Sequence, residues 1–208
     1  MNKPSKSYPN FDKGTSTLVF KGEEDNPREF YMIGGICWPV QYELPDQPPD
    51  VLGYAILAGK DLETGIVYVF EQKDFVTIEH IFNEKQIVAY HGLAPWFNTI
   101  WARYYANRFY FNQPDEISRK YRLDVIRSEM ITSRPQMIEV PMPDIKDALH
   151  TVWRYAKTKG VKIDADSLLG VHLPLAKVDK HKRNIASPPV HALACMLVGL
   201  DRFPHRKP

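Results

Sequence analysis

The order of secondary-structure patterns along the chain constrains its fold more than any other feature of the sequence. Three segments rich in aromatic and β-branched residues come first, at 30–42, 52–58 and 66–72. Each of them is typical of a β-strand. The glycine-bounded segment 59–65 predicts a hairpin between the second and third, and prolines within 44–50 keep that stretch out of a sheet. The sequence therefore predicts an antiparallel start to a sheet.

Helical patterns, in which apolar residues recur at three and four positions, dominate the rest of the chain. They cover residues 95–106, 114–130, 144–159 and 190–201. Strand-like segments at 108–111 and 136–140 alternate with the first three, whereas 75–90 mixes helical and extended spacing and 164–187 is polar and irregular. The order predicts an α/β fold, in which a mixed sheet of about five strands, three antiparallel first, is flanked by helices.

Length and composition fit one globular domain. Of the 208 residues, 44% are hydrophobic and 25% are charged, which excludes wholesale disorder. We expect a flexible arm at 1–16, a single α/β domain at 17–203 and a basic tail at 204–208. No signal peptide or membrane-length apolar run is visible, which predicts a cytoplasmic protein without a membrane partner. Cys37 and Cys195 lie in apolar runs and are expected to be buried free thiols.

Charge is distributed unevenly along the chain. Lysine and arginine number 27 against 25 acidic residues, which gives a net charge of +2. Residues 174–208 alone contain seven basic and two acidic side chains, so this segment carries +5 and the remainder carries −3. A basic end on a near-neutral body is suited to a polyanion such as DNA or RNA, and the alternative is a solvated tail.

Two groups of basic residues are candidates for nucleic-acid binding. They are Arg119, Arg122 and Arg127 on the predicted helix at 114–130, and Lys180, Lys182 and Arg183 in the polar segment near the C-terminus. If the two groups share a face, they form a footprint that neutralises phosphates and releases counterions. The alternative is that these charges only solvate the surface.

The succession of elements resembles the ribonuclease H-like superfamily, and the end of the chain resembles the nuclease domains of viral DNA-packaging terminases. Those domains commonly finish with a helix that begins H-D-D-x-x-D-A-x-A. The comparable stretch here, 186–194, reads Ala-Ser-Pro-Pro-Val-His-Ala-Leu-Ala. Its Ala-Leu-Ala packing face agrees, whereas Ser187 and Pro188 replace the paired acids and His191 replaces the later one. The resemblance implies a phage- or packaging-related domain with degenerate catalytic acids.

The missing acids matter because nucleases of this fold hold two divalent metals through carboxylate oxygens. The family places a central acid on the first strand, but residues 30–38 contain no carboxylate, and neither does 108–111. An active centre would need acids from loops, for which the candidates are Asp46, Asp115 and Asp144. We therefore predict no bound metal and no cofactor, with Mg²⁺ or Mn²⁺ required only if the chain is an active, divergent nuclease.

Three functional interpretations follow. The favoured one is a domain that binds nucleic acid or a partner protein without cutting. The first alternative is the active metal-dependent nuclease, and the second is a structural or interaction protein with no nucleic-acid role. Other catalytic patterns are missing, since the sequence has no H-E-x-x-H, G-x-S-x-G, Walker or G-x-G-x-x-G motif.

Two further features carry structural expectations. Gly34-Gly35, in the middle of the first strand, predicts a β-bulge or a close approach of another backbone. The dense aromatic block within 96–111 has helical and strand spacing, so we expect mostly core rings rather than a base-stacking surface.

Overall fold

The computed structural model describes residues 3–42, 50–75, 77–82, 85–90, 93–106, 108–112, 136–140, 145–178, 184–185 and 187–203. Its strands are β1 (Pro4–Asn10), β2 (Thr15–Phe20), β3 (Arg28–Tyr42), β4 (Asp50–Asp61), β5 (Val67–Phe75), β6 (Thr77–Phe82), β7 (Lys85–Tyr90), β8 (Arg108–Phe111), β9 (Gln136–Glu139), β10 (Val161–Lys162), β11 (Lys177–Val178) and β12 (Asn184–Ile185). Its helices are α1 (Leu93–Tyr104), α3 (Ile145–Lys157), α4 (Leu168–His172), a 3₁₀ turn (Leu173–Leu175) and α5 (Pro188–Arg202).

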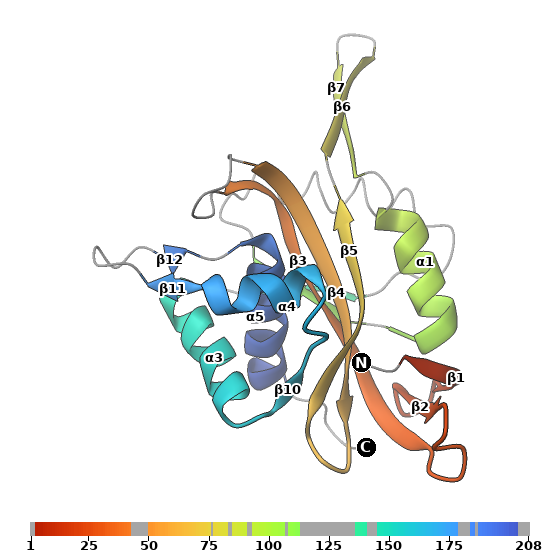
Figure 1. Ribbon diagram of the computed structural model, residues 1–208. Helices are drawn as coiled ribbons and strands as arrows, with labels where there is room; N and C mark the ends of the chain where they lie inside the picture. The colour runs from red at the N-terminus through yellow and green to blue at the C-terminus, as the bar shows by residue number, and fades with distance from the viewer. Residues whose placement is uncertain are drawn as a thin grey trace.

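A mixed sheet of eight strands forms the centre of the molecule (Figure 1). Its order is β9-β8-β3-β4-β5-β10, and the β1–β2 hairpin joins it through β2, which pairs with the beginning of β3. Strands β3, β4 and β5 are antiparallel neighbours, whereas β8 runs parallel to β3 and β9 runs parallel to β8. The predicted mixed α/β architecture and its antiparallel start are confirmed.

The sheet has more strands than the five expected, because some strands lack a side-chain pattern. Residues 4–10, assigned from the sequence to a flexible arm, form β1 and pair with β2. Only Pro4 of β1 is buried, and the buried anchors of the hairpin, Leu18 and Phe20, lie on β2. The two-residue strand β10 is joined to β5 by backbone hydrogen bonds. Main-chain pairing of this kind leaves little trace in hydropathy.

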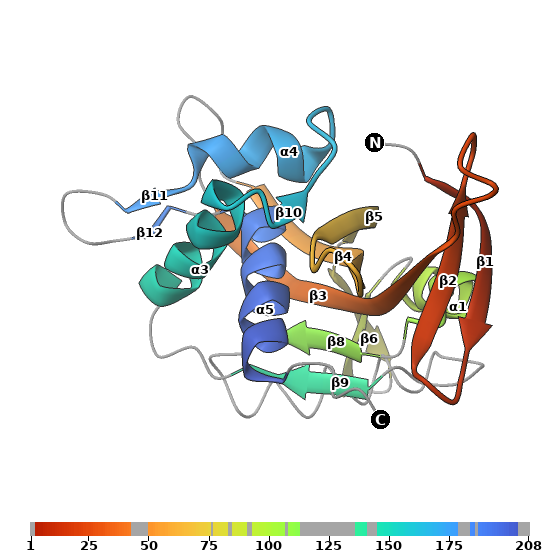
Figure 2. The same cartoon turned by 90° about the horizontal axis from the view of Figure 1, so that it is seen from below.

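Two apolar cores lie on the two faces of the sheet. Figure 1 shows α1 on one side and α3 and α5 on the other, and the view from below in Figure 2 agrees. The α1 face is aromatic and includes Phe30, Phe97 and Phe109, all fully buried. The opposite face packs Ile33 and Ile56 of the sheet against helix α5. The aromatic block is therefore largely core, as expected from its spacing.

Gly34 and Gly35 let side chains and backbone approach β3 closely on both faces. A Cβ on Gly34 would lie 2.0 Å from the Phe109 ring, and one on Gly35 would lie 2.1 Å from the Ala192 carbonyl oxygen of α5. The predicted close approach is confirmed, because no larger residue fits without movement. The bulge occurs further along, where the β3–β4 register shifts between Cys37 and Val40.

Helix α5 is buried on nearly every side, as its sequence predicted. Leu193, Ala194, Leu197 and Val198 are all buried, and most of the helix packs into the core on its face of the sheet.

Strands β4 and β5 are joined by a turn in which the Asp61 carboxylate accepts hydrogen bonds from the backbone N–H groups of Glu63 and Thr64. This turn confirms the predicted hairpin.

Two segments that the sequence left undecided have defined structure. Within 75–90, β6 and β7 pair as an antiparallel hairpin that extends away from the body of the molecule beyond β5 (Figure 1). The polar stretch 164–187 contains α4, the 3₁₀ turn and the short strands β11 and β12. Among the described residues, no helix has the length and apolarity needed to cross a membrane.

Candidate functional site

Strands β3, β8 and β9 run parallel, so the carboxyl ends of β8 and β9 lie at one edge of the sheet beside Cys37 and Trp38 of β3 (Figure 2). In α/β sheets this edge is a common place for a binding site. The described residues there are Cys37 and Trp38 on β3, Asn112 after β8, and Glu139 at the end of β9. The Asn112 side-chain amide donates to the Val140 carbonyl oxygen at 2.9 Å and so joins the two strand ends.

Both cysteines near this edge are structural thiols. Cys37 is buried, and its Sγ donates to the Trp38 carbonyl oxygen at 3.4 Å. Burial raises the pKa of the Cys195 thiol to about 12, although a backbone hydrogen bond with Asn112 opposes this shift. Because a thiolate is the nucleophilic form of cysteine, Cys195 is unsuited to covalent catalysis near neutral pH. The expected buried free thiols are confirmed.

The start of α5 has no acid, and its first two residues have no backbone N–H group. Ser187 stands before the helix, is 3% exposed, and its hydroxyl has no hydrogen-bond partner among the described atoms. Pro188 and Pro189 follow at the first two helical positions and have no N–H to offer an anion. The backbone N–H of His191 donates to the Ser187 carbonyl oxygen at 3.0 Å. This helix start is therefore built for packing rather than for holding a metal or a phosphate.

The candidate residues from the sequence all lie outside the described parts of the chain. They are Asp46, Asp115 and Asp144 for catalysis, and Arg119, Arg122, Arg127, Lys180, Lys182 and Arg183 for nucleic-acid binding. Within the described residues, no cluster of three or more histidine, cysteine or acidic side chains could hold a metal ion. The proposals for these residues therefore remain predictions.

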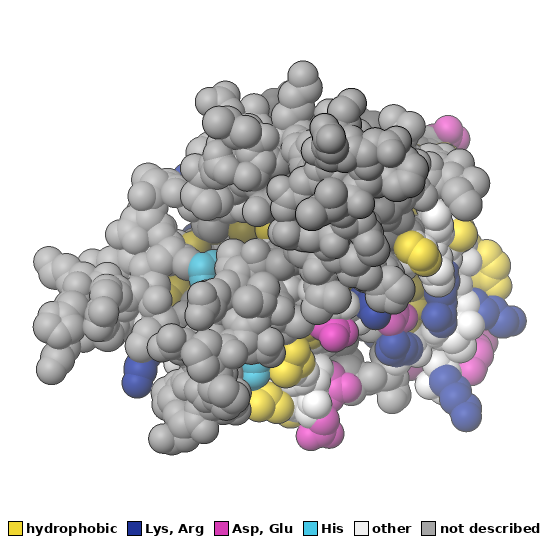
Figure 3. Space-filling view, turned by 90° about the horizontal axis from the view of Figure 1, so that it is seen from above, with side chains coloured by type: hydrophobic (Ala, Val, Ile, Leu, Met, Phe, Trp, Pro, Cys, Tyr) yellow, Lys and Arg dark blue, Asp and Glu magenta, His cyan; other side chains and the backbone are white. Residues whose placement is uncertain are grey.

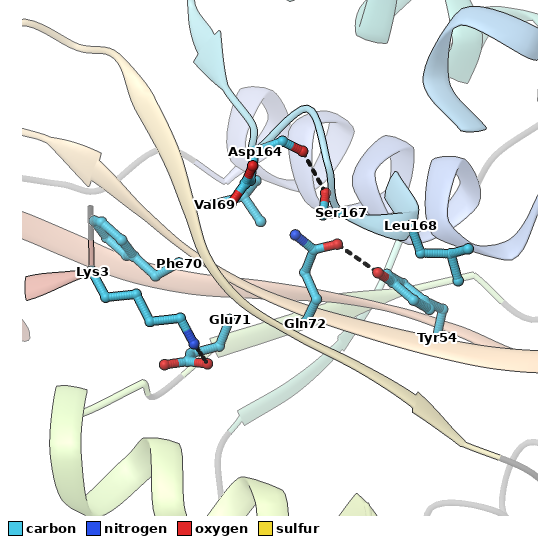
Figure 4. Close-up of a pocket in the computed structure, with 9 residues that line it drawn as sticks. All are labelled: Lys3, Tyr54, Val69, Phe70, Glu71, Gln72, Asp164, Ser167 and Leu168. Carbon is cyan, nitrogen blue, oxygen red and sulfur yellow. Dashed lines mark hydrogen bonds and ion pairs between the residues drawn. The ribbon is translucent and has the colours of Figure 1, made fainter. Parts of the chain in front are cut away.

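A pocket of about 270 Å³ lies beside β5 (Figure 4). None of the residues that line it was a candidate site residue from the sequence. Its walls come from four segments of the chain: Lys3 before β1, Tyr54 on β4, residues 69–72 on β5, and the segment 164–168 that leads into α4. It lies where β10 stops pairing with β5, since β10 contacts only Val67 and Tyr68.

Glu71 organises one side of this pocket. Its carboxylate forms an ion pair with Lys3 at 2.6 Å, accepts a hydrogen bond from the Tyr104 hydroxyl at 3.2 Å and lies 3.8 Å from the Arg103 guanidinium. Burial, and then the Glu71 charge, raise the pKa of Tyr104, so this phenol stays protonated. The network connects β5 to α1 and to the residue that precedes β1.

The other side of the pocket is held by local hydrogen bonds. The Tyr54 hydroxyl donates to the Gln72 side-chain oxygen at 2.5 Å, and burial raises the Tyr54 pKa. The Ser167 hydroxyl donates to the Asp164 carbonyl oxygen at 2.6 Å and accepts from the Gly170 N–H at 3.1 Å. A backbone hydrogen bond from Asp166 is the main cause that lowers the pKa of Asp164. Ser167 is therefore a capping residue rather than an activated nucleophile, and the pocket is suited to hydrogen bonding.

One weak signal for this pocket is visible in the sequence. In β5 an apolar run, Val67–Phe70, changes abruptly to the polar residues Glu71 and Gln72. That change indicates that β5 leaves the core at this point, but it does not identify the other residues that line the pocket. Lys3 and Asp164 are far from β5 along the chain, so only the tertiary structure brings them together.

Burial of His172 on α4 predicts that the stability of the protein depends on pH. Its side chain is buried, and burial lowers its pKa in the folded state. Between that lowered pKa and the ordinary value near 6.5, the unfolded chain binds the proton and the folded chain does not. We therefore expect the free energy of unfolding to fall as the pH drops below about 6.5.

Urea unfolding at pH 7.5 and pH 5.5 measures this dependence. His172→Gln should reduce the loss of stability between the two pH values. The matched control is His150→Gln, because His150 is an exposed histidine on α3. That variant should keep the dependence of the unaltered protein, and equal behaviour of the two variants would refute the assignment to His172.

Comparisons with known proteins give no family for this chain. No protein-family model, curated protein or solved structure matches it. Function must therefore be inferred from the order of the sheet, from the residues at its edges and from the surface that the described residues present.

Proposed function

We propose that the chain is a ribonuclease H-like domain that binds nucleic acid and does not cut it. The observation that carries this proposal is the order β5-β4-β3-β8-β9, in which β4 alone runs against the other four strands. Three antiparallel strands followed by helix–strand alternation are the features by which the sequence resembles that superfamily. Helix α1 on one face and the C-terminal helix α5 on the other agree with this interpretation.

The absence of cutting is inferred from the middle of the sheet. Residues 30–42 of β3 contain no carboxylate, and the neighbouring strand β8 contains none. At Gly35 the backbone of α5 occupies the space that a side chain would need. A two-metal centre requires several carboxylate oxygens around a shared space. These strands therefore support a domain that shares the fold of the family it resembles but lacks the carboxylates that hold the two metals.

Nucleic-acid binding is supported by charge rather than by a base-reading element. The segment 174–208 carries a charge of +5, and its lysines and arginines are suited to phosphate contacts. Contacts of this kind depend little on sequence and weaken steeply as salt is added. Weak, salt-sensitive binding to DNA or RNA is the expected activity.

Fluorescence polarisation against salt tests the binding. The Lys182→Ala, Arg183→Ala double variant should flatten the slope of log affinity against log salt by about one to two units, since two phosphate contacts are lost. The matched control removes two exposed lysines from elsewhere, Lys21 and Lys157. This control has the same net charge as the Lys182→Ala, Arg183→Ala variant and should keep the salt dependence of the unaltered protein.

The same preparation tests cutting. Incubation with Mn²⁺ should leave single-stranded and double-stranded DNA intact, and calorimetry should show no stoichiometric micromolar binding of Mn²⁺. Metal-dependent cleavage that is lost on replacing Asp46, Asp115 or Asp144 would establish the active nuclease instead. The carboxylates would then converge from loops.

A second candidate function is recognition of a partner protein, and the β5 edge favours it. Beyond Tyr68, no described strand pairs with the outer edge of β5. Such an edge is a template for an added strand. The apolar side chains of Leu168, Val171 and Leu175 are exposed on the α4 segment, and Leu168 also lines the pocket beside β5. No association with any nucleic acid at tens of micromolar protein and low salt would favour this function.

A further inference from the structure

Three aromatic rings meet at the surface where the β1–β2 turn contacts the end of α1. Phe11 lies in the turn and is 60% exposed. Its ring centroid lies 4.4 Å from that of Tyr105 in an edge-on arrangement and 6.2 Å from that of Trp101. The Trp101 and Tyr105 rings are themselves 5.6 Å apart. We call Phe11, Trp101 and Tyr105 the aromatic platform.

Tyr105, one of the three platform residues, has an unusual backbone conformation. Its φ of 53° lies in the left-handed region, which non-glycine residues rarely adopt. The residue ends α1 through a 2.9 Å hydrogen bond from its N–H to the Trp101 carbonyl oxygen. Strained residues of this kind cluster at functional sites. Here the strained residue is one whose ring contacts Phe11.

The segments that carry the aromatic platform contain more basic than acidic residues. Residues 3–20 and helix α1 together contain four basic residues, Lys3, Lys6, Lys13 and Arg103, and one acid, Asp12. In Figure 3, with left and right as in Figure 1, lysine and arginine side chains lie beside hydrophobic and acidic ones on the side that carries α1 and the hairpin.

Lys13 and Arg103 form only long ion pairs with the nearby acids, whereas Glu71 holds Lys3 at 2.6 Å. Lys13 lies 3.9 Å from Glu29, and Arg103 lies 3.8 Å from Glu71, yet about half of each basic side chain is exposed. Exposed ion pairs contribute little free energy, so a phosphate can compete with the carboxylate for either cation. The surface therefore combines apolar rings with accessible positive charge.

We propose that the aromatic platform stacks on unpaired bases of single-stranded nucleic acid, with Lys13 and Arg103 contacting the flanking phosphates. This inference rests on the proposed nucleic-acid binding and adds its substrate class. Rings beside cations are the recurring chemistry of single-strand recognition, because every base has a face on which an aromatic ring can stack. In a duplex the bases are already stacked on one another, so the same surface favours single strands.

Phe11 variants test the platform against a fluorescein-labelled 12-mer of thymidine at low salt. Phe11→Ala and Phe11→Leu should each weaken binding about 5- to 50-fold, whereas Phe11→Trp, which keeps a ring, should bind within about twofold of the unaltered protein. The matched control is Tyr8→Ala, because Tyr8 is 55% exposed on the same hairpin. Its affinity should be unchanged. Because Phe11 and Tyr8 are both exposed, the three Phe11 variants and Tyr8→Ala should all remain folded, which urea unfolding checks.

A second readout follows the stacking itself. The 12-mer should quench part of the tryptophan fluorescence of the unaltered protein, and Trp101→Phe should remove that part. A duplex of the same length should quench less at equal saturation. Stacking on Trp101 predicts this pattern, and phosphate contacts alone do not.

The outcomes separate this inference from the proposed function. If all Phe11 variants bind the 12-mer as tightly as the unaltered protein while the Lys182→Ala, Arg183→Ala variant binds more weakly, the platform is refuted and nucleic-acid binding stands. If the unaltered protein binds neither the 12-mer nor a duplex, both are refuted. Equal weakening by Tyr8→Ala and Phe11→Ala would assign the effect to the hairpin as a whole and refute the platform.

Discussion

Gly35→Ala is expected to destabilise the protein by about 3 kcal/mol or more, at the upper end of what overpacking costs in protein cores. The added methyl group would lie 2.1 Å from the Ala192 carbonyl oxygen and 2.9 Å from the Met196 Cβ. The closer of these atoms belongs to the backbone of α5, so relief requires the helix to move. Moving α5 disturbs most of one core, because its apolar side chains fill that face of the sheet.

Urea unfolding followed by tryptophan fluorescence measures this change. The control is Gly160→Ala after α3, where the new methyl group would lie no closer than 3.2 Å to its neighbours, the nearest being the Tyr155 side chain. That control should change the free energy of unfolding by less than about 1 kcal/mol. Equal stability of Gly35→Ala and the unaltered protein would show that α5 does not lie against β3 as described.

Leu197→Ala is the second change for which we expect a large effect, a loss of about 2–5 kcal/mol in the free energy of unfolding. Leu197 is fully buried within α5, and truncation leaves a cavity in a core that has little freedom to collapse. The matched control is Leu175→Ala, because Leu175 is 41% exposed. The control should cost less than about 1 kcal/mol, and a loss below half a kcal/mol for Leu197→Ala would show that the helix is peripheral.

The candidate sites differ in how far the sequence predicted them. The lack of a carboxylate within residues 30–42 of β3 and the prolines that begin α5 are visible in the sequence, because each is a property of residue types within one element. The pocket beside β5 is different, since Lys3 and Glu71 are 68 residues apart and their contact depends on the β1–β2 hairpin. The aromatic platform is similar, because Phe11 and Tyr105 belong to segments with no shared pattern.

The sequence by itself determined the local elements and the residues that face the core. Strands β3, β4, β5 and β8 follow from runs rich in aromatic and β-branched residues, and helix α1 follows from apolar residues spaced three and four apart. The buried helix α5 follows from an apolar run that begins after two prolines. The close approach at Gly34-Gly35 follows from two residues without side chains inside a strand.

Only the tertiary structure decided which strands are neighbours and what lies at their edges. The eight-stranded order, the addition of β1 and β10, and the pairing of β8 with the later part of β3 depend on backbone hydrogen bonds between distant segments. The backbone N–H and C=O groups that make these bonds are the same in nearly every residue, so they leave no mark in the sequence. The pocket beside β5 and the aromatic platform form where such segments meet, and their residues become neighbours only once the chain has folded.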